Sequence, residues 1–121
     1  MKYMLLIYNN PATLEGLSEQ DRAELGGDVD AIMAELQDRG EFVDGNALAD
    51  SSTAKTVRLH GGAVAATDGP FAEAKEQFAG YITVDCESEA RALEIARRWP
   101  DPRYGGAIEV RALMNESGAE M

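Results

Sequence analysis

The order of the expected strands and helices constrains the fold of this chain more than any other feature of its sequence. Short apolar segments bounded by glycine, proline or asparagine predict strands, and apolar residues recurring every three to four positions predict helices. The expected strands cover 2–8, 42–49, 55–60, 63–67, 78–85 and 107–113, and the expected helices run from Ser18 to Gly40 and from Ser88 to Trp99. This order predicts an α+β domain in which an antiparallel sheet carries two helices on one face.

Two pairs of adjacent glycines interrupt the expected elements. Gly61-Gly62 separates two strands and predicts an inserted β-hairpin, because tight hairpin turns need residues that tolerate positive φ. Gly26-Gly27 falls inside the first expected helix, where each glycine costs about 1 kcal/mol relative to alanine. A break with Asp28 capping a new start, or the close approach of a neighbour, would explain this pair, and we expect the break.

Composition limits the classes of function. A chain of 121 residues suits one domain, expected over 1–114, with a frayed and disordered tail over 115–121. The net charge of −11 disfavours nucleic-acid binding, and no apolar segment is long enough for a membrane span. The lone Cys86 excludes an internal disulfide, and without a Cys/His cluster we expect no metal and no cofactor. We expect a cytoplasmic protein.

The expected sheet raises the question of what covers its second face. If both helices lie on one face, the other face exposes apolar residues such as Ile7, Tyr81 or Leu113 unless a partner covers them. A homodimer is the simplest solution, because a two-fold axis buries the same patch on both copies.

The most specialised segment runs from Asp68 to Phe78 and combines a Gly-Pro turn with several charges. Asp68, Glu73 and Glu76 are the candidate catalytic residues, because crowded acids beside a cation acquire unequal pKa values suited to acid and base roles. The structural alternative is that Asp68 caps the turn, Lys75 pairs with an acid and Glu76 is solvated.

Residues around this segment are candidates for substrate binding: Lys75, Arg58, Phe71, Tyr8, Tyr81 and His60. An arginine binds a carboxylate with two hydrogen bonds, and aromatic rings line apolar pockets. Histidine is the side chain best suited to a general base near neutral pH, which makes His60 a candidate, although its place before the hairpin turn favours an exposed position. Arg58 also suits pairing across a sheet, and Phe71 suits core packing.

The run DGPFAEAKEQFAGY, followed by the closing IEVRAL, resembles the DGPF-motif group of the YCII-related family. The similarity extends from Lys2-Tyr3-Met4-Leu5 through Thr56-Val57-Arg58 to Ile108-Glu109-Val110-Arg111. It implies a ferredoxin-like dimeric α+β barrel. Some members of the family carry a histidine and an aspartate in a pocket between the first helix and the sheet, but the first expected helix of this chain contains no histidine.

These observations lead to two functional expectations. The first is a small-molecule-binding protein, and through its charged motif an enzyme that uses acid–base chemistry in a pocket near the DGPF segment. The alternative is a non-catalytic ligand-sensing or protein-interaction domain linked to transcription regulation, because the resemblance implies an association with sigma factors.

Overall fold

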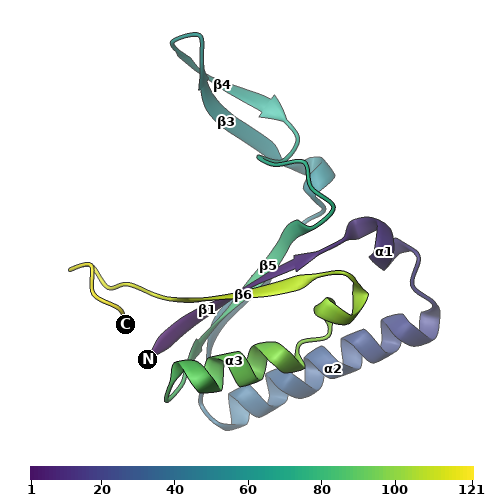
Figure 1. Cartoon of the computed structure of the whole chain (residues 1–121), viewed down its shortest axis with the longest axis vertical. Coiled ribbons are helices and arrows are strands. Elements are labelled where there is room, and N and C mark those ends of the chain that lie inside the picture. Colours follow the sequence, from purple (N-terminus) through teal and green to yellow (C-terminus); the bar gives the residue numbers. More distant parts are fainter.

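The computed structural model describes residues 1–121 and contains a four-stranded antiparallel sheet (Figure 1). Its strands are β1 (Lys2–Asn9), β2 (Phe42–Ala47), β5 (Gln77–Asp85) and β6 (Ala107–Ala112), in the order β2-β5-β1-β6. Two long helices, α2 (Glu19–Asp38) and α3 (Glu89–Arg98), lie on one side of this sheet. The α+β class and the antiparallel sheet are as the sequence predicts.

The two long helices begin where their capping residues predict. The Ser18 hydroxyl accepts a hydrogen bond from the Asp21 amide at 3.1 Å, and the Ser88 hydroxyl accepts one from the Arg91 amide at 3.2 Å. These bonds satisfy amides that the first turn of a helix leaves without a partner. None of the helices combines the length and the hydropathy that crossing a bilayer requires.

The expected break at Gly26-Gly27 is wrong, because α2 runs unbroken through both glycines. A Cβ atom at either position would meet nothing within 4 Å, so close approach by a neighbour does not explain the pair either. The packing of Ile32 and Leu36, which are buried on this helix, offsets a local cost of about 1 kcal/mol per glycine.

Three short helical elements connect the longer ones and were not expected. They are α1 (Pro11–Glu15) and the 3₁₀ turns η1 (Ser51–Thr53) and η2 (Asp101–Tyr104). The side chain of Asn10 caps α1 by accepting from the amides of Ala12 and Thr13. Elements of three to five residues are too short to show an apolar period, so periodicity does not detect them.

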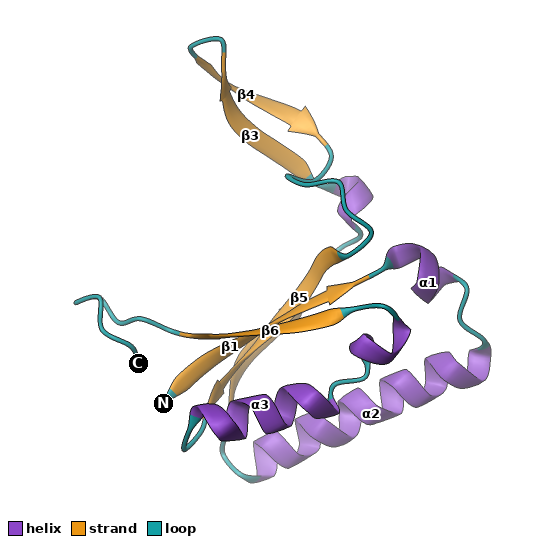
Figure 2. Ribbon diagram, in the orientation of Figure 1, coloured by secondary structure: helices purple, strands orange, loops and turns teal.

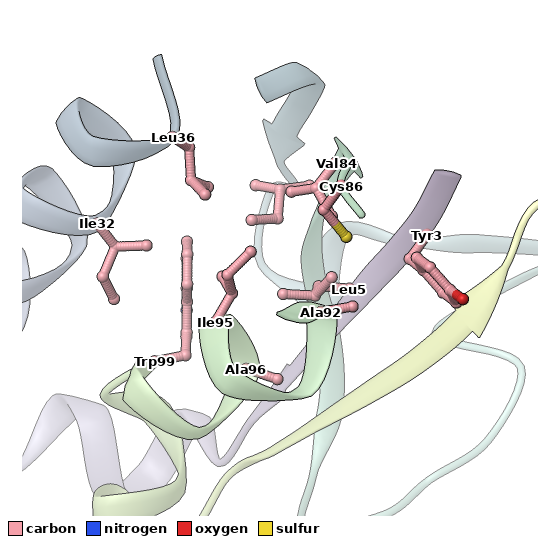
Figure 3. Packing of buried hydrophobic residues seen from close by; sticks show 11 residues of the cluster. Tyr3, Leu5, Ile32, Leu36, Val84, Cys86, Ala92, Ile95, Ala96 and Trp99 are labelled. Carbon is pink, nitrogen blue, oxygen red and sulfur yellow. The ribbon is translucent and has the colours of Figure 1, made fainter. Parts of the chain in front are cut away.

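The hydrophobic core lies between the sheet and the two long helices (Figure 3). Eleven buried residues form it: Tyr3, Leu5, Ile32, Leu36, Ile82, Val84, Cys86, Ala92, Ile95, Ala96 and Trp99. Because side chains alternate along a strand, Ile7 follows Tyr3 and Leu5 onto the helix side and packs against this core. The prediction that Ile7 lies on the uncovered face is therefore wrong.

The uncovered face of the sheet carries the alternate residues. Met4 and Leu6 lie between the core residues of β1, and each is only partly buried. Tyr81 lies opposite Leu6 in the pairing of β1 with β5, so its side chain shares that face. No other element of the chain lies over this side of the sheet (Figure 2).

Strands β3 (Lys55–His60) and β4 (Ala63–Asp68) form a separate two-stranded antiparallel ribbon. Gly61 and Gly62 join them with φ values of 59° and 84°, the positive values that a glycine pair accommodates in a primed turn. The ribbon projects away from the four-stranded sheet and from both long helices (Figure 2).

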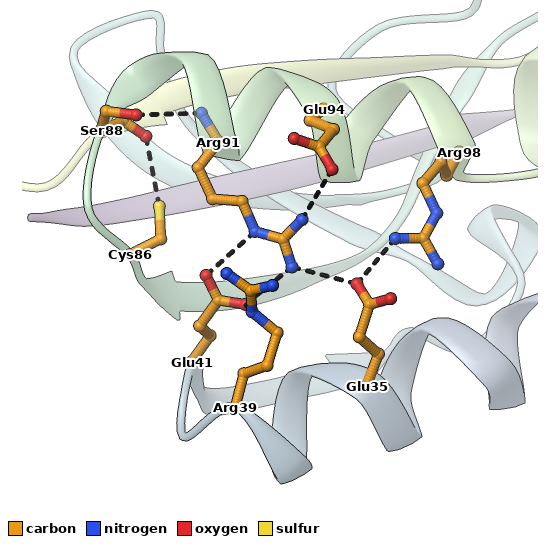
Figure 4. Close-up of polar contacts among 8 residues, drawn as sticks. All are labelled: Glu35, Arg39, Glu41, Cys86, Ser88, Arg91, Glu94 and Arg98. Carbon is orange, nitrogen blue, oxygen red and sulfur yellow. Dashed lines mark hydrogen bonds and ion pairs between the residues drawn. The ribbon is translucent and has the colours of Figure 1, made fainter.

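A buried arginine links the helices to the start of β2 (Figure 4). Arg91, whose side chain is 5% exposed, donates to both carboxylate oxygens of Glu41 at 2.8 and 3.0 Å and to Glu35 at 3.0 Å. Hydrogen bonds from Arg98 and then from Arg91 lower the pKa of Glu35 to about 2. This network ties α2 to α3 and lies apart from the cavities described below.

Residues 115–121 form a single exposed turn, closed by hydrogen bonds to the Asn115 side chain from the amides of Ser117 and Ala119. The predicted disorder of this tail stays a prediction.

Candidate functional site

A cavity of about 330 Å³ lies on the helix side of the sheet, and we call it the Asp101 cavity. Its apolar lining comes from the three strands β1, β2 and β5, from α2 and from the end of α3, and includes Ile7, Val29, Met33, Phe42 and Trp99. Asn9 and Asp101 add polar groups. A volume of this size falls at the lower end of the range of about 300–1,000 Å³ for small-molecule sites.

Local chain geometry holds Asp101 at this cavity. Pro100 and Pro102 flank it, and proline restricts φ on both sides of the turn. The Gly106 amide donates to the Asp101 carbonyl at 3.0 Å, and a Cβ atom at Gly106 would lie only 2.3 Å from the Tyr8 carbonyl oxygen. The turn therefore packs directly against β1, and only glycine fits at that contact.

The environment of Asp101 changes the acidity of its carboxyl group. The residue is 7% exposed, and burial raises its pKa because the charged form loses its hydration. Hydrogen bonds from the Trp99 side chain, from its own amide and from the Asn9 side chain oppose this rise. A carboxyl group with a raised pKa, in an apolar cavity, is suited to exchange a proton with a bound molecule.

The three candidate catalytic acids lie elsewhere, on the exposed side of the molecule. Asp68 ends β4 and forms an ion pair with Lys55 at 2.5 Å across the ribbon, and it does not cap the turn. Glu73 and Glu76 lie in the loop between β4 and β5, where both are exposed and neither forms a salt bridge. Lys75, in the same loop, is also exposed and pairs with no acid.

Besides Lys75, the ribbon and its following loop hold three of the candidate binding residues. Arg58 donates to the Phe71 carbonyl at 3.0 Å, and its guanidinium group lies 4.6 Å from the centroid of the Phe71 ring. Phe71 is exposed and so is not part of the core. His60 is exposed beside the hairpin turn, the position that the structural alternative predicts.

The two candidate tyrosines lie on the main sheet. The Tyr8 hydroxyl donates to Glu109 at 3.3 Å, and the Tyr8 ring lies 5.5 Å from that of Phe78. The Tyr81 hydroxyl accepts from the Asn46 side chain at 3.1 Å, and the residue also borders the Asp101 cavity.

Three of the candidates come together at the base of the ribbon. Tyr8, Phe71 and Glu76 line a cleft of about 550 Å³, which we call the motif cleft. Glu73 and Lys75 line a separate, shallower depression nearby, and His60, Arg58 and Asp68 line neither. The motif thus contributes to two neighbouring hollows, and its acids do not converge on one point.

Asp101 is not among the residues that the sequence predicts for a site, because Pro100-Asp101-Pro102 after Trp99 indicates the end of a helix. A signal was present: an acid between two prolines, directly after the single tryptophan of the chain, is unusual for a simple helix stop. Its burial could not be anticipated, because it depends on β1 and α2, which are distant in sequence.

Comparisons with known proteins agree over almost the whole chain. The family model described as "YCII-related domain" matches residues 1–117. An uncharacterized protein of Rhizobium meliloti (strain 1021), R00369, is 32% identical over 114 residues, which cover 93% of this chain and 92% of that protein. The name of that relative states no activity.

Proposed function

We propose that this chain, which belongs to the family of YCII-related domains, binds a small molecule in the Asp101 cavity. The observation that carries the proposal is a buried carboxyl group with a raised pKa in the wall of a largely apolar cavity. Asp101 is the group through which the protein would exchange a proton with that molecule.

The lining of the cavity indicates the kind of ligand. Val29, Met33, Phe42 and Trp99 offer apolar contact, which stabilises a ligand by about 25 cal/mol for each Å² of apolar surface removed from water. Protonated, Asp101 donates a hydrogen bond to a carbonyl oxygen, and ionised, it accepts one from a hydroxyl or amine. The fitting ligand is therefore a small, mainly apolar molecule with one such polar group.

The sole tryptophan provides a direct measure of this binding, because Trp99 lines the cavity. Titration with small carbonyl, hydroxyl and amine compounds is expected to change its fluorescence where a compound enters. Val29→Phe adds a ring inside the cavity and is expected to weaken such binding by at least about tenfold, a loss of about 1.4 kcal/mol.

Ala34→Phe is the matched control, because it adds the same ring at an exposed position of α2 outside the cavity. This variant should bind as the wild type does. If Val29→Phe and the wild type bound the same compound with equal affinity, the compound would not bind in the Asp101 cavity. A fluorescence that responds to none of the compounds would count against the proposal.

The motif cleft is a second candidate site, favoured by the meeting of Tyr8 and Phe71 with the carboxylate of Glu76. In this version, Glu76 supplies the acid–base group of the cleft, and Glu73 and Lys75 lie in the neighbouring depression. Asp68, Arg58 and His60 line neither hollow. Tyr81 then contributes to the surrounding sheet surface.

The double substitution Glu73→Ala/Glu76→Ala tests the motif cleft. It is expected to abolish binding there and to change stability by no more than about 0.5 kcal/mol, because both side chains are exposed. Affinity measured by calorimetry and thermal unfolding are the two readouts. The control is Glu116→Ala/Glu120→Ala, which removes the same amount of charge from the exposed tail. If the Glu73→Ala/Glu76→Ala variant bound the ligand with full affinity, these two acids would not be part of the binding site.

We also propose that two copies associate through the uncovered face of the sheet, as in a ferredoxin-like dimeric barrel. Partly exposed Met4, Leu6 and Tyr81 on that face support this proposal. Ligand binding without turnover would favour the alternative function, a non-catalytic ligand-sensing or interaction domain, over an enzyme.

A further inference from the structure

The ribbon of residues 55–68, called the arm from here on, has one apolar and one polar face. Val57 and Leu59 lie directly opposite Ala66 and Val64, so these four side chains share a face. Val57, Leu59 and Val64 are 64%, 72% and 72% exposed. The other face carries Thr56, Arg58, His60, Ala63, Ala65 and Thr67.

The chain itself leaves the apolar face of the arm uncovered. The two strands pair only with each other, and the arm is joined to the domain through its base, where the Thr56 hydroxyl donates to the Gly69 carbonyl at 2.7 Å. An isolated two-stranded ribbon is at best marginally stable in water. A continuous row of exposed valine and leucine side chains therefore marks an interaction surface.

The direction of the arm indicates what covers it. It rises on the side of the sheet away from α2 and α3, which is also the side of the uncovered sheet face (Figure 1). A second copy stacked on that sheet face would lie alongside the arm. Two-fold symmetry would use both arms equally, because an isologous interface repeats each contact.

The size of the interface also favours a second copy. From strand dimensions, the arm face measures about 20 by 10 Å and the sheet face about 20 by 20 Å. The sheet face alone offers about half of the roughly 800 Å² per partner typical of stable interfaces. The arm face adds about 200 Å², so each copy buries about 600 Å², which is the lower end of the range for stable, specific interfaces.

Charge distinguishes the arm from the rest of this acidic chain. The arm carries two positive residues, Lys55 and Arg58, and one negative residue, Asp68, so its net charge is +1. Because the whole chain has a net charge of −11, the residues outside the arm have a net charge of −12. Two copies with a charge of −11 repel each other over most of their surfaces. The positively charged arm is instead attracted to the acidic surface of a second copy.

We propose that the apolar face of the arm docks on the uncovered sheet face of a second copy, so that two arms are exchanged across a two-fold axis. This inference rests on the homodimer proposed above and names the surface that holds it together.

The test compares lysine substitutions on the two faces of the arm. Val57→Lys/Val64→Lys places two charges on the apolar face, and Ala63→Lys/Ala65→Lys places the same two charges on the polar face. Sedimentation equilibrium measures the mass against the 13.0 kDa chain, and circular dichroism measures the fold. Val57, Val64, Ala63 and Ala65 are all exposed, so both variants are expected to fold.

We expect a dimeric wild type, a dimeric polar-face variant, and an apolar-face variant whose dimer dissociation constant rises by at least about 100-fold. An apolar-face variant that dimerises like the wild type overturns the arm docking and leaves the homodimer standing. A monomeric wild type overturns both. Loss of the dimer in both variants overturns the assignment of the contact to the apolar face, and an open series of larger species overturns the two-fold exchange.

Discussion

Replacing Arg91 by methionine is expected to destabilise the fold by about 3 kcal/mol, the lower end of the cost of breaking a buried ion pair, because Glu41 keeps the half-exposed Arg39 as a partner at 2.9 Å. The side chains of Arg91 and Glu41 are only 5% and 8% exposed, so the remaining carboxylate would have little access to water. Glu35 would lose one of its two arginine partners as well. Urea unfolding at neutral pH, with the midpoint and slope compared with those of the wild type, measures the effect.

A second partner of the same guanidinium group provides the control. Glu94 also contacts Arg91, but its side chain is 61% exposed, and Glu94→Ala is expected to cost no more than about 1 kcal/mol. Arg91→Met/Glu41→Leu removes both buried charges and is expected to recover most of the loss. A single Arg91→Met variant as stable as the wild type would show that burial does not make this pair costly to break.

Asp101→Asn is expected to stabilise the protein at neutral pH. Burial raises the pKa of Asp101, so the folded state favours the protonated carboxyl group. The resulting stability is present below the ordinary pKa of about 3.8 and is lost as the pH rises through the raised value. Asparagine keeps the shape without the charge and avoids this loss. The melting temperature should rise by about 4 °C for each kcal/mol recovered.

The pH dependence separates this effect from a general change in packing. The advantage of Asp101→Asn should disappear near pH 3, where the wild-type carboxyl group is protonated. Asp44→Asn, at an exposed position on β2, should change the melting temperature at neither pH. An Asp101→Asn variant that is less stable than the wild type at neutral pH would show that the carboxylate serves the fold.

The functional effect of Asp101→Asn is measured on a compound identified through Trp99 fluorescence. If the protein converts that compound, loss of a general acid or base is expected to lower turnover by about 10²- to 10⁴-fold. Binding should persist, because the apolar walls of the cavity are unchanged. Unchanged turnover would show that Asp101 is not the acid or base of the reaction.

The substitutions at Arg91 and Asp101 are expected to have opposite effects on stability. Arg91 holds two helices and a strand together, whereas Asp101 is a buried carboxyl group that the fold would tolerate better as an amide. Retaining a group at a cost in stability is typical of a functional position. This contrast is a physical reason to place the site at Asp101.

The sequence by itself determined the features that depend on neighbouring residues. Ser18 and Ser88 cap their helices, Gly61-Gly62 turns the ribbon, and the alternation of apolar segments set the order of strands and long helices. Caps and tight turns need only the amides and φ values of a few adjacent residues, so they can be predicted without the rest of the fold.

Only the tertiary structure decided the features that join distant segments. It kept α2 whole through Gly26-Gly27, turned Ile7 toward the helices and left the arm outside the core. It also buried Asp101 beside residues of β1, β2 and α2. Burial and pKa depend on packing between parts of the chain that are far apart in sequence, and no local pattern contains that information.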